Sequence, residues 1–324
     1  MFEYELPTAV STLDKKELLP AGTLVTEQVV ADIAGLGRLQ PSEECPLLEY
    51  GTVREDLQRF LAIPPYRDIF SDKEIVTELF ADMQKVRLPL ALLKALDYFR
   101  QHDFHTYRHI LMVFNLSSLL IKGLGGDRQK SDADFVAGPS HDFGKISVPL
   151  HVLKKAGPLT IHEKQILKYH PLSGYVLLAY YLGDHRHPAV LVARDHHERR
   201  DGSGYPRGIT NLDPVVEMVA ACDVYDALLS PRPYRPLSFD NRTALEEMTR
   251  MADSGILGWE CVEALVSCNR HGRPGAADVF VSRDVRGTPP VGNCYGLILD
   301  EEENVVAEQE FNSQGRSLSH ISPS

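Results

Sequence analysis

The chain has 324 residues, enough for one large domain with appendages or for two domains. Its hydrophobic fraction of 43% and charged fraction of 24% exclude a wholly disordered protein. The formal net charge is −11 and no block of Lys and Arg stands out, which argues against a protein that binds duplex nucleic acid.

Two further patterns concern cellular location. No uninterrupted apolar run reaches the roughly 18 residues of a membrane-spanning helix, and the acidic N-terminus lacks the basic region of a signal peptide. The five cysteines are scattered and form no CxxC pair, which is typical of a reducing compartment and disfavours a thiolate zinc site. We therefore expect a cytoplasmic protein without a membrane span.

The first 68 residues predict a small α/β segment. LPAGTLV is typical of a short strand after a turn, and Thr26 is placed to cap a helix that Gly35 and Gly37 would end. Pro64 and Pro65 indicate a linker after this segment.

Helical periodicity dominates from about residue 70 to 270. We expect helices over 72–86, 89–100 and 105–121, and one or two over 245–268. Thr160 and Glu163 form a capping box that predicts the start of another helix, and we expect this helix to end at His170. Pro188 and Pro214 suit the first turns of two further helices.

The C-terminal residues differ. The strand-like runs DVFVS, CYGLIL and NVVAEQEF predict a small β element near 277–310, followed by a disordered last dozen residues. The fold class predicted is therefore mainly α, with an N-terminal α/β segment over 1–68, a helical domain over 69–272, and a small β-rich tail over 273–324.

Histidines are concentrated in one third of the chain, since 11 of the 13 lie between positions 102 and 197. His105 and His109 are four residues apart and would face the same side of a helix, as paired metal ligands do. A pair of surface histidines is an equally good interpretation of that spacing alone. His141 and Asp142 offer an imidazole beside a carboxylate that could bridge two metals, and Lys145 brings a cation that a phosphate could use.

Other polar side chains fall on apolar faces. His170 shares the stripe of Ile166 and Leu167, where a buried histidine is more often structural than a ligand. His196 and His197 are adjacent and point inward, so they need polar partners such as metal ions. The turn-rich loop after them contains Tyr205, an aromatic side chain suited to contacting a ligand.

Asp223 lies on the apolar stripe formed by Val216, Val219, Ala220 and Ala227. A buried carboxylate normally pairs with a cation or binds a metal, so an ion pair with an arginine is the alternative. Asp226 follows on the same face one turn later. Taken together, these side chains supply too many ligands for one ion and about enough for two, and imidazole with carboxylate suits iron, manganese or zinc.

Several strings resemble the HD-GYP family, a branch of the HD phosphohydrolases that degrades cyclic dinucleotides in bacteria. They are HDFGK at 141–145, the following LKKAGPLTIHEKQILKYHP, HHERRDGSGYPRG at 196–208, DVYDAL at 223–228 and RPYR at 232–235. The resemblance covers about residues 70–270 and implies an HD-type helical bundle core. It also implies a metal-dependent phosphodiesterase that hydrolyses cyclic di-GMP to pGpG, or further to GMP, through a hydroxide that bridges two metals.

The resemblance also implies site residues. Asp142 would be the bridging carboxylate, Lys145 would contact the scissile phosphate, and Tyr205 would contact the ligand. The metal ligands would be His109, His141, Asp142, His170, His196, His197 and Asp223, and the guanine and phosphate sites would be lined by Asp226, Arg232 and Arg235.

Two departures from the family pattern matter. Family members with three metals have a Glu where this chain has His105, so we expect two divalent transition-metal ions per chain, iron or manganese, with His105 as the extra ligand if a third is held. AGPS precedes the HD pair where the family has a smooth helix, so we expect the entry to that helix to be bent. Alternative functions are a non-catalytic receptor for a cyclic dinucleotide and a phosphodiesterase for cyclic GMP-AMP. A homodimer or a diguanylate cyclase is a conceivable protein partner.

Overall fold

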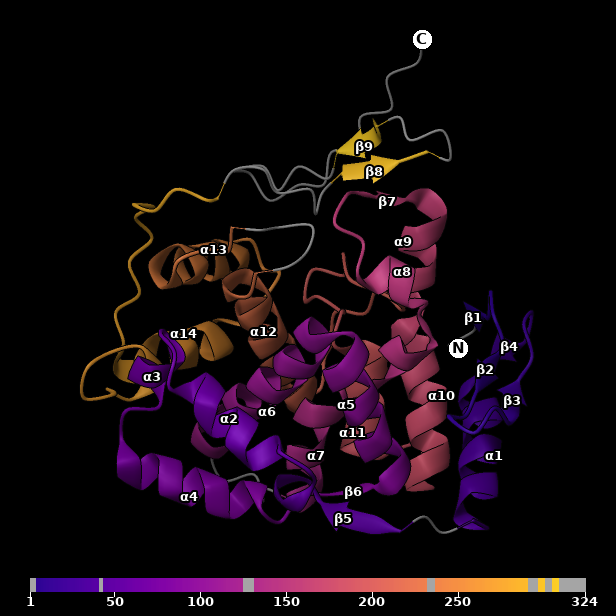
Figure 1. Ribbon diagram of the computed structural model, residues 1–324. Coiled ribbons are helices and arrows are strands. Elements are labelled where there is room, and N and C mark those ends of the chain that lie inside the picture. Colours follow the sequence, from indigo (N-terminus) through magenta and orange to yellow (C-terminus); the bar gives the residue numbers. More distant parts are fainter. Residues whose placement is uncertain are drawn as a thin grey trace.

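The structure is a computed structural model that describes residues 4–40, 43–124, 131–231, 237–290, 297–300 and 305–308. Figure 1 shows helices packed around a central α6, with short strands at the periphery. The mainly α fold predicted from the sequence is confirmed.

The α-helices are α1 (Glu27–Arg38), α2 (Val53–Leu61), α3 (Tyr66–Ile69), α4 (Lys73–Met83), α5 (Leu90–His102), α6 (Phe104–Leu124), α7 (Asp132–Ser140), α8 (Leu150–Leu153), α9 (Ile161–Lys168), α10 (His170–Leu182), α11 (Pro188–Asp195), α12 (Pro214–Leu229), α13 (Asn241–Asp253) and α14 (Trp259–Cys268). The 3₁₀ helices are η1 (Leu47–Glu49), η2 (Phe143–Ser147) and η3 (Ala276–Asp278). The strands are β1 (Tyr4–Glu5), β2 (Val10–Ser11), β3 (Glu17–Leu19), β4 (Leu24–Val25), β5 (Glu44–Pro46), β6 (Arg87–Pro89), β7 (Leu159–Thr160), β8 (Leu297–Leu299) and β9 (Val305–Glu308).

The N-terminal strands form two small antiparallel pairs, β1 with β4 and β2 with β3. Thr26 caps α1 by accepting a hydrogen bond from the backbone N–H of Val29. The prediction that Gly35 and Gly37 end this helix is wrong, since α1 runs to Arg38. A Cβ atom on Gly37 would lie 1.8 Å from the carbonyl oxygen of Tyr180, so this glycine permits close packing of α1 on α10.

The N-terminal segment and the helical domain share one hydrophobic core. Buried apolar residues extend without a break in packing from Leu6 to Val266. Strand β5 pairs antiparallel with β6, so residues 44–46 are hydrogen-bonded to residues 87–89. Helices α2 and α4 both contact α6. The segment before residue 69 is thus packed into the body of the molecule.

Three helix starts predicted in the helical domain are confirmed. Thr160 and Glu163 form the capping box of α9, and Pro188 and Pro214 occupy the first turns of α11 and α12. The prediction that His170 ends the helix opened at Thr160 is wrong. Helix α9 ends at Lys168, and His170 begins α10. Residues 170–180 of α10 are all buried, so this helix is buried on every face over that range.

The C-terminal prediction is correct in part. Strand β8 pairs parallel with β7 and antiparallel with β9, beside α9 (Figure 1). The strand predicted in DVFVS is not formed. Val279 and Val281 pack against the core and Phe280 is exposed, the alternation of a strand, but no described strand pairs with this segment. The last dozen residues lie outside the described ones. None of the described helices is both long and apolar enough to cross a bilayer.

Candidate metal centre

Five helical segments converge at one buried place. The side chains they contribute are His109 from α6, His141 and Asp142 from the end of α7, His170 from the start of α10, His196 and His197 from the end of α11, and Asp223 from α12. All but His197 are buried. The close approach of the 141–145 segment to α10 depends on Gly144, where a Cβ atom would lie 1.9 Å from the carbonyl oxygen of His170.

The donor atoms form two groups of three. One group is His109, His141 and Asp223, and the other is His170, His196 and His197. Within each group, the nitrogen and carboxylate donor atoms lie within 4.8 Å of one another. Each group therefore offers three of the ligands that one metal ion needs.

Asp142 lies between the two groups. Its Oδ2 atom is 3.8 Å from His109 Nε2 and 3.5 Å from His141 Nε2. Its Oδ1 atom is 3.3 Å from His170 Nε2 and 3.7 Å from His196 Nε2. One carboxylate oxygen thus faces each group, which is the arrangement a bridging ligand requires.

Four imidazoles are oriented by hydrogen bonds from their outer nitrogen. His109 Nδ1 donates to Asp226 Oδ2 at 2.6 Å, His141 Nδ1 to the Gly138 carbonyl at 2.8 Å, and His170 Nδ1 to the Leu167 carbonyl at 2.7 Å. His196 Nδ1 lies 3.1 Å from the carbonyl oxygens of Val192 and Ala193. These bonds keep the proton on Nδ1 and turn the lone pair of Nε2 toward the centre, as in metal-ligating histidines.

The inward nitrogens fit metal ions. His141 Nε2 is buried without a hydrogen-bond partner among the described residues. The Nε2 atoms of His170 and His196 lie 3.3 Å apart with their lone pairs facing each other, an arrangement that a cation between them would stabilise. Imidazole with carboxylate and no thiolate suits divalent iron, manganese or zinc.

The pKa values of the histidines follow from burial and charge. Burial and the neighbouring His141 and His170 lower the pKa of His196 to about 3, and burial with His196 and His170 lowers that of His197 well below its ordinary value. Both rings are therefore neutral at pH 7 and able to bind a metal. For His141, burial is outweighed by the carboxylates of Asp142 and Asp223, so its pKa is raised.

The carboxylates remain ionised. Burial opposes the charge of Asp142, but Lys145 and His141 lower its pKa well below the ordinary value. Burial likewise opposes the charge of Asp223, but the neighbouring His109 and His197 imidazoles lower its pKa well below the ordinary value. The arginine partner considered for Asp223 is not found among the described residues, since its neighbours are His109 Nε2 at 2.9 Å and His197 Nδ1 at 3.9 Å.

Two predicted substrate contacts lie at the edge of the centre. Lys145 Nζ is 2.5 Å from Asp142 Oδ2. The Lys145 side chain is 14% exposed, so it is more accessible to solvent than the buried Asp142 that it contacts. The Tyr205 ring stacks on His197 at 4.7 Å between centroids, and Lys168 Nζ lies 5.2 Å from the centre of the Tyr205 ring.

Of the remaining predicted site residues, the structure describes Asp226 and His105. Asp226 has no exposed surface and contacts His109 from the side away from Asp223, so it offers no face to a substrate. His105 is exposed and belongs to neither donor group. Arg232 and Arg235 lie outside the described residues.

Sequence patterns did not reveal some neighbours of the site. Glu198 is buried and accepts hydrogen bonds from the backbone N–H groups of Arg207 and Ile209, which ties the GYP loop to the histidine pair. The sequence signal that could have identified Glu198 is its position directly after His196 and His197. Arg108 and Tyr66, which contact Asp226, gave none, because their partners are more than 100 residues away in the chain.

Comparison with known proteins agrees with this geometry. The family model described as HD domain matches residues 88–258, just over half of the chain. The chain is 38% identical over 146 residues to the cyclic di-GMP phosphodiesterase response regulator RpfG of Xanthomonas campestris pv. campestris, covering 44% of this chain and 38% of that protein.

Two other relatives are similar. A cyclic di-GMP phosphodiesterase of Thermotoga maritima is 35% identical over 186 residues, covering 56% of this chain and 49% of that protein. The 3'3'-cGAMP-specific phosphodiesterase 1 of Vibrio cholerae is 35% identical over 134 residues, covering 40% and 30%. The chain spans less than half the length of each of these three relatives. This protein belongs to the HD domain family and, by its HDFGK and HHERRDGSGYP motifs, to the HD-GYP branch.

Proposed function

We propose that this protein is a metal-dependent phosphodiesterase that hydrolyses cyclic di-GMP to the linear dinucleotide pGpG. The observation that carries the proposal is the pair of three-donor groups with Asp142 between them. Two divalent ions bound there would activate water near neutral pH and offset the charge on a phosphate. Cys222 and Cys261 are poor candidates for a competing nucleophile, since both are buried and burial raises the pKa of both thiols.

The chain's own residues have distinct tasks in this proposal. The seven ligands hold the ions, and Lys145 moves from Asp142 to a phosphate oxygen when the carboxylate is engaged. Tyr205, held against His197, contacts the nucleotide from the GYP loop. Asp226 acts behind His109 instead of in the guanine pocket, while Arg232 and Arg235 remain candidate substrate contacts.

A second substrate is favoured by one comparison. One relative is named for 3'3'-cGAMP, so a cyclic GMP-AMP phosphodiesterase is the alternative activity. The test is turnover of a panel of cyclic dinucleotides by anaerobically purified protein, with Asp142→Ala as the control. Linear pGpG from the wild type alone supports the proposal. Tight binding without any linear product would instead assign a receptor.

The number of metals needs its own experiment. We propose two ions per chain, iron or manganese, because the described donors form two groups and His105 belongs to neither. Elemental analysis of protein purified without chelators should give a value near two that is unchanged in His105→Ala. A value near three that falls to two in this variant would identify His105 as a ligand of a third ion. A homodimer and a cyclase partner stay predictions.

A further inference from the structure

The segment that precedes the HD domain match reaches the metal centre through one side chain. Tyr66 on α3 is 1% exposed, and its phenol donates a hydrogen bond to Asp226 Oδ1. The other oxygen of Asp226 accepts the Nδ1 proton of His109 at 2.6 Å. Tyr66 lies outside the matched residues 88–258, so this contact is an addition by the N-terminal segment.

Asp226 is surrounded by donors. Besides Tyr66 and His109, it contacts Arg108 Nη1 at 3.4 Å and Ser230 Oγ at 3.0 Å, and it has no exposed surface. Burial raises the pKa of Tyr66 well above its ordinary value, so the phenol remains a donor.

The direction of these bonds determines which nitrogen of His109 faces the metal. Because Asp226 Oδ2 accepts the Nδ1 proton, Nε2 carries the lone pair and is the nitrogen on the side of Asp223, whose Oδ1 lies 2.9 Å away. Tyr66 holds one carboxylate oxygen so that the other stays aimed at His109. We propose that Tyr66 is a positioning residue of the metal centre, acting through Asp226 on His109, an inference that rests on the metal-dependent function proposed above.

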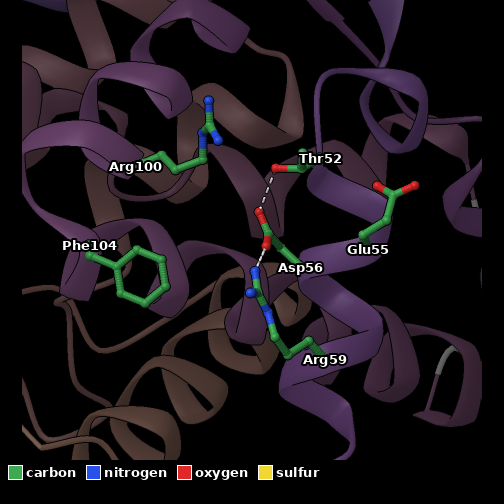
Figure 2. Close-up of a pocket in the computed structure, with 6 residues that line it drawn as sticks. All are labelled: Thr52, Glu55, Asp56, Arg59, Arg100 and Phe104. Carbon is green, nitrogen blue, oxygen red and sulfur yellow. Dashed lines mark hydrogen bonds and ion pairs between the residues drawn. The ribbon is translucent and has the colours of Figure 1, made fainter.

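Packing between the N-terminal helices and α6 holds Tyr66 in place. The Arg108 guanidinium lies over the rings of Phe60 on α2 and Tyr66 on α3, at 5.8 and 5.5 Å from their centres. One residue before Arg108, Tyr107 donates to Asp56 on α2 at 2.8 Å. Asp56 also lines a pocket of about 480 Å³. Figure 2 shows it bonded to Thr52 and Arg59, with Arg100 and Phe104 lining the same pocket.

The two buried tyrosines provide a matched experiment. Each is 1% exposed and donates a hydrogen bond to a buried aspartate. The aspartate bound by Tyr66 is Asp226, which contacts His109, whereas Tyr107 binds Asp56 on α2. Titration of metal-free protein with Mn²⁺ should show binding about tenfold weaker at one class of sites in Tyr66→Phe, the usual effect of losing a hydrogen bond behind a metal ligand. In Tyr107→Phe, thermal stability should fall while Mn²⁺ affinity stays that of the wild type.

A double-mutant cycle tests the route through Asp226. Asp226→Asn should weaken Mn²⁺ binding at least as much as Tyr66→Phe, and the double variant should bind no more weakly than Asp226→Asn alone. Additive losses, or an unchanged affinity in a folded Tyr66→Phe, would overturn the inference. If Tyr66→Phe does not fold, unchanged Mn²⁺ affinity in Asp226→Asn overturns it equally.

Turnover separates this inference from the proposed function. With saturating Mn²⁺ and cyclic di-GMP, Tyr66→Phe should recover most of the wild-type kcat with the same KM, since only the hold on the ion is weakened. A wild type that binds Mn²⁺ but hydrolyses no cyclic dinucleotide would refute the function and leave the metal-binding test of Tyr66 valid.

Discussion

Lys145 and Asp142 form a close ion pair at the accessible edge of a cluster of imidazoles. The contact between Lys145 Nζ and Asp142 Oδ2 is 2.5 Å long. In the proposed function, a phosphate oxygen would approach Asp142 at the position that Lys145 occupies. Because Asp142 also faces both donor groups, any ion bound there competes with Lys145 for the same oxygens. In the proposed function, Lys145 would thereby become available to a substrate once the metals are bound.

We expect Lys145→Ala to lower kcat by about 100-fold, with a smaller change in KM. The reason is that its charge meets negative charge that develops mainly in the transition state. Steady-state kinetics on cyclic di-GMP measures both constants. Lys155→Ala is the matched control, because Lys155 also pairs with one carboxylate, Glu163 at 2.6 Å, but does not contact Asp142. A selective rise in KM would assign Lys145 to substrate binding alone.

At the scale of elements, the site depends on how closely the 3₁₀ segment η2 approaches α10. Gly144 belongs to η2, and the backbone of α10 leaves no space for a side chain at this position. Asp142 precedes η2 and His170 begins α10, so this contact sets the distance between the bridging carboxylate and one donor group.

Gly144→Ala should therefore damage both folding and metal binding. The added methyl group would meet backbone atoms of His170 and Gly174, so the two elements must separate. We expect unfolding free energy to fall by about 1–3 kcal/mol or more, with reduced Mn²⁺ affinity. Gly157→Ala, where the methyl group would meet nothing within 4 Å, is the control for the substitution itself. Equal behaviour of the two variants would refute the packing argument.

The contact between α2 and α6 makes stability depend on pH. Burial opposes the charge of Asp56, but hydrogen bonds from Tyr107, Thr52 and Arg59 lower its pKa. Since the folded pKa is the lower one, this stabilisation is present above the unfolded value of about 4 and is lost as the pH falls below it.

Asp56→Asn should consequently lower the unfolding free energy at pH 7 by about 1–3 kcal/mol, the usual range for breaking a buried hydrogen-bonded charge. Denaturant titrations of wild type and variant at pH 7, 5 and 3 check this. The difference between their unfolding free energies should be smaller at pH 3 than at pH 7. A difference in unfolding free energy that grows on acidification would contradict the lowered pKa of Asp56.

For the whole molecule, the metal centre lies where five helical segments of the shared core meet. Ions bound there therefore stabilise the folded state only, since the donors are separated in the unfolded chain. Removing them with a chelator should lower the melting temperature, and at an ion concentration of about 1,000 times Kd the loss is about 4 kcal/mol. Calorimetry before and after chelation, and after Mn²⁺ is restored, measures this. Asp142→Ala should be nearly insensitive to the chelator.

Local patterns predicted the helical character and several helix starts, and they named the candidate donors. Periodicity, the Thr160 capping box and the first-turn prolines act within a few residues, so they can be recognised without tertiary structure. The strand expected around Phe280 failed for the converse reason, because alternation creates a strand only where a partner pairs with it.

Tertiary structure decided how the donors are divided and oriented. The sequence predicted inward-facing histidines and, through the family resemblance, a bridging Asp142, but only packing shows which donors form each group and that His170 begins a helix. The positions of Asp226 and Tyr66 depend on contacts across 117 and 160 residues of chain. A hydrogen bond between such distant residues leaves no periodic signal in one sequence, since its direction exists only once the helices have packed.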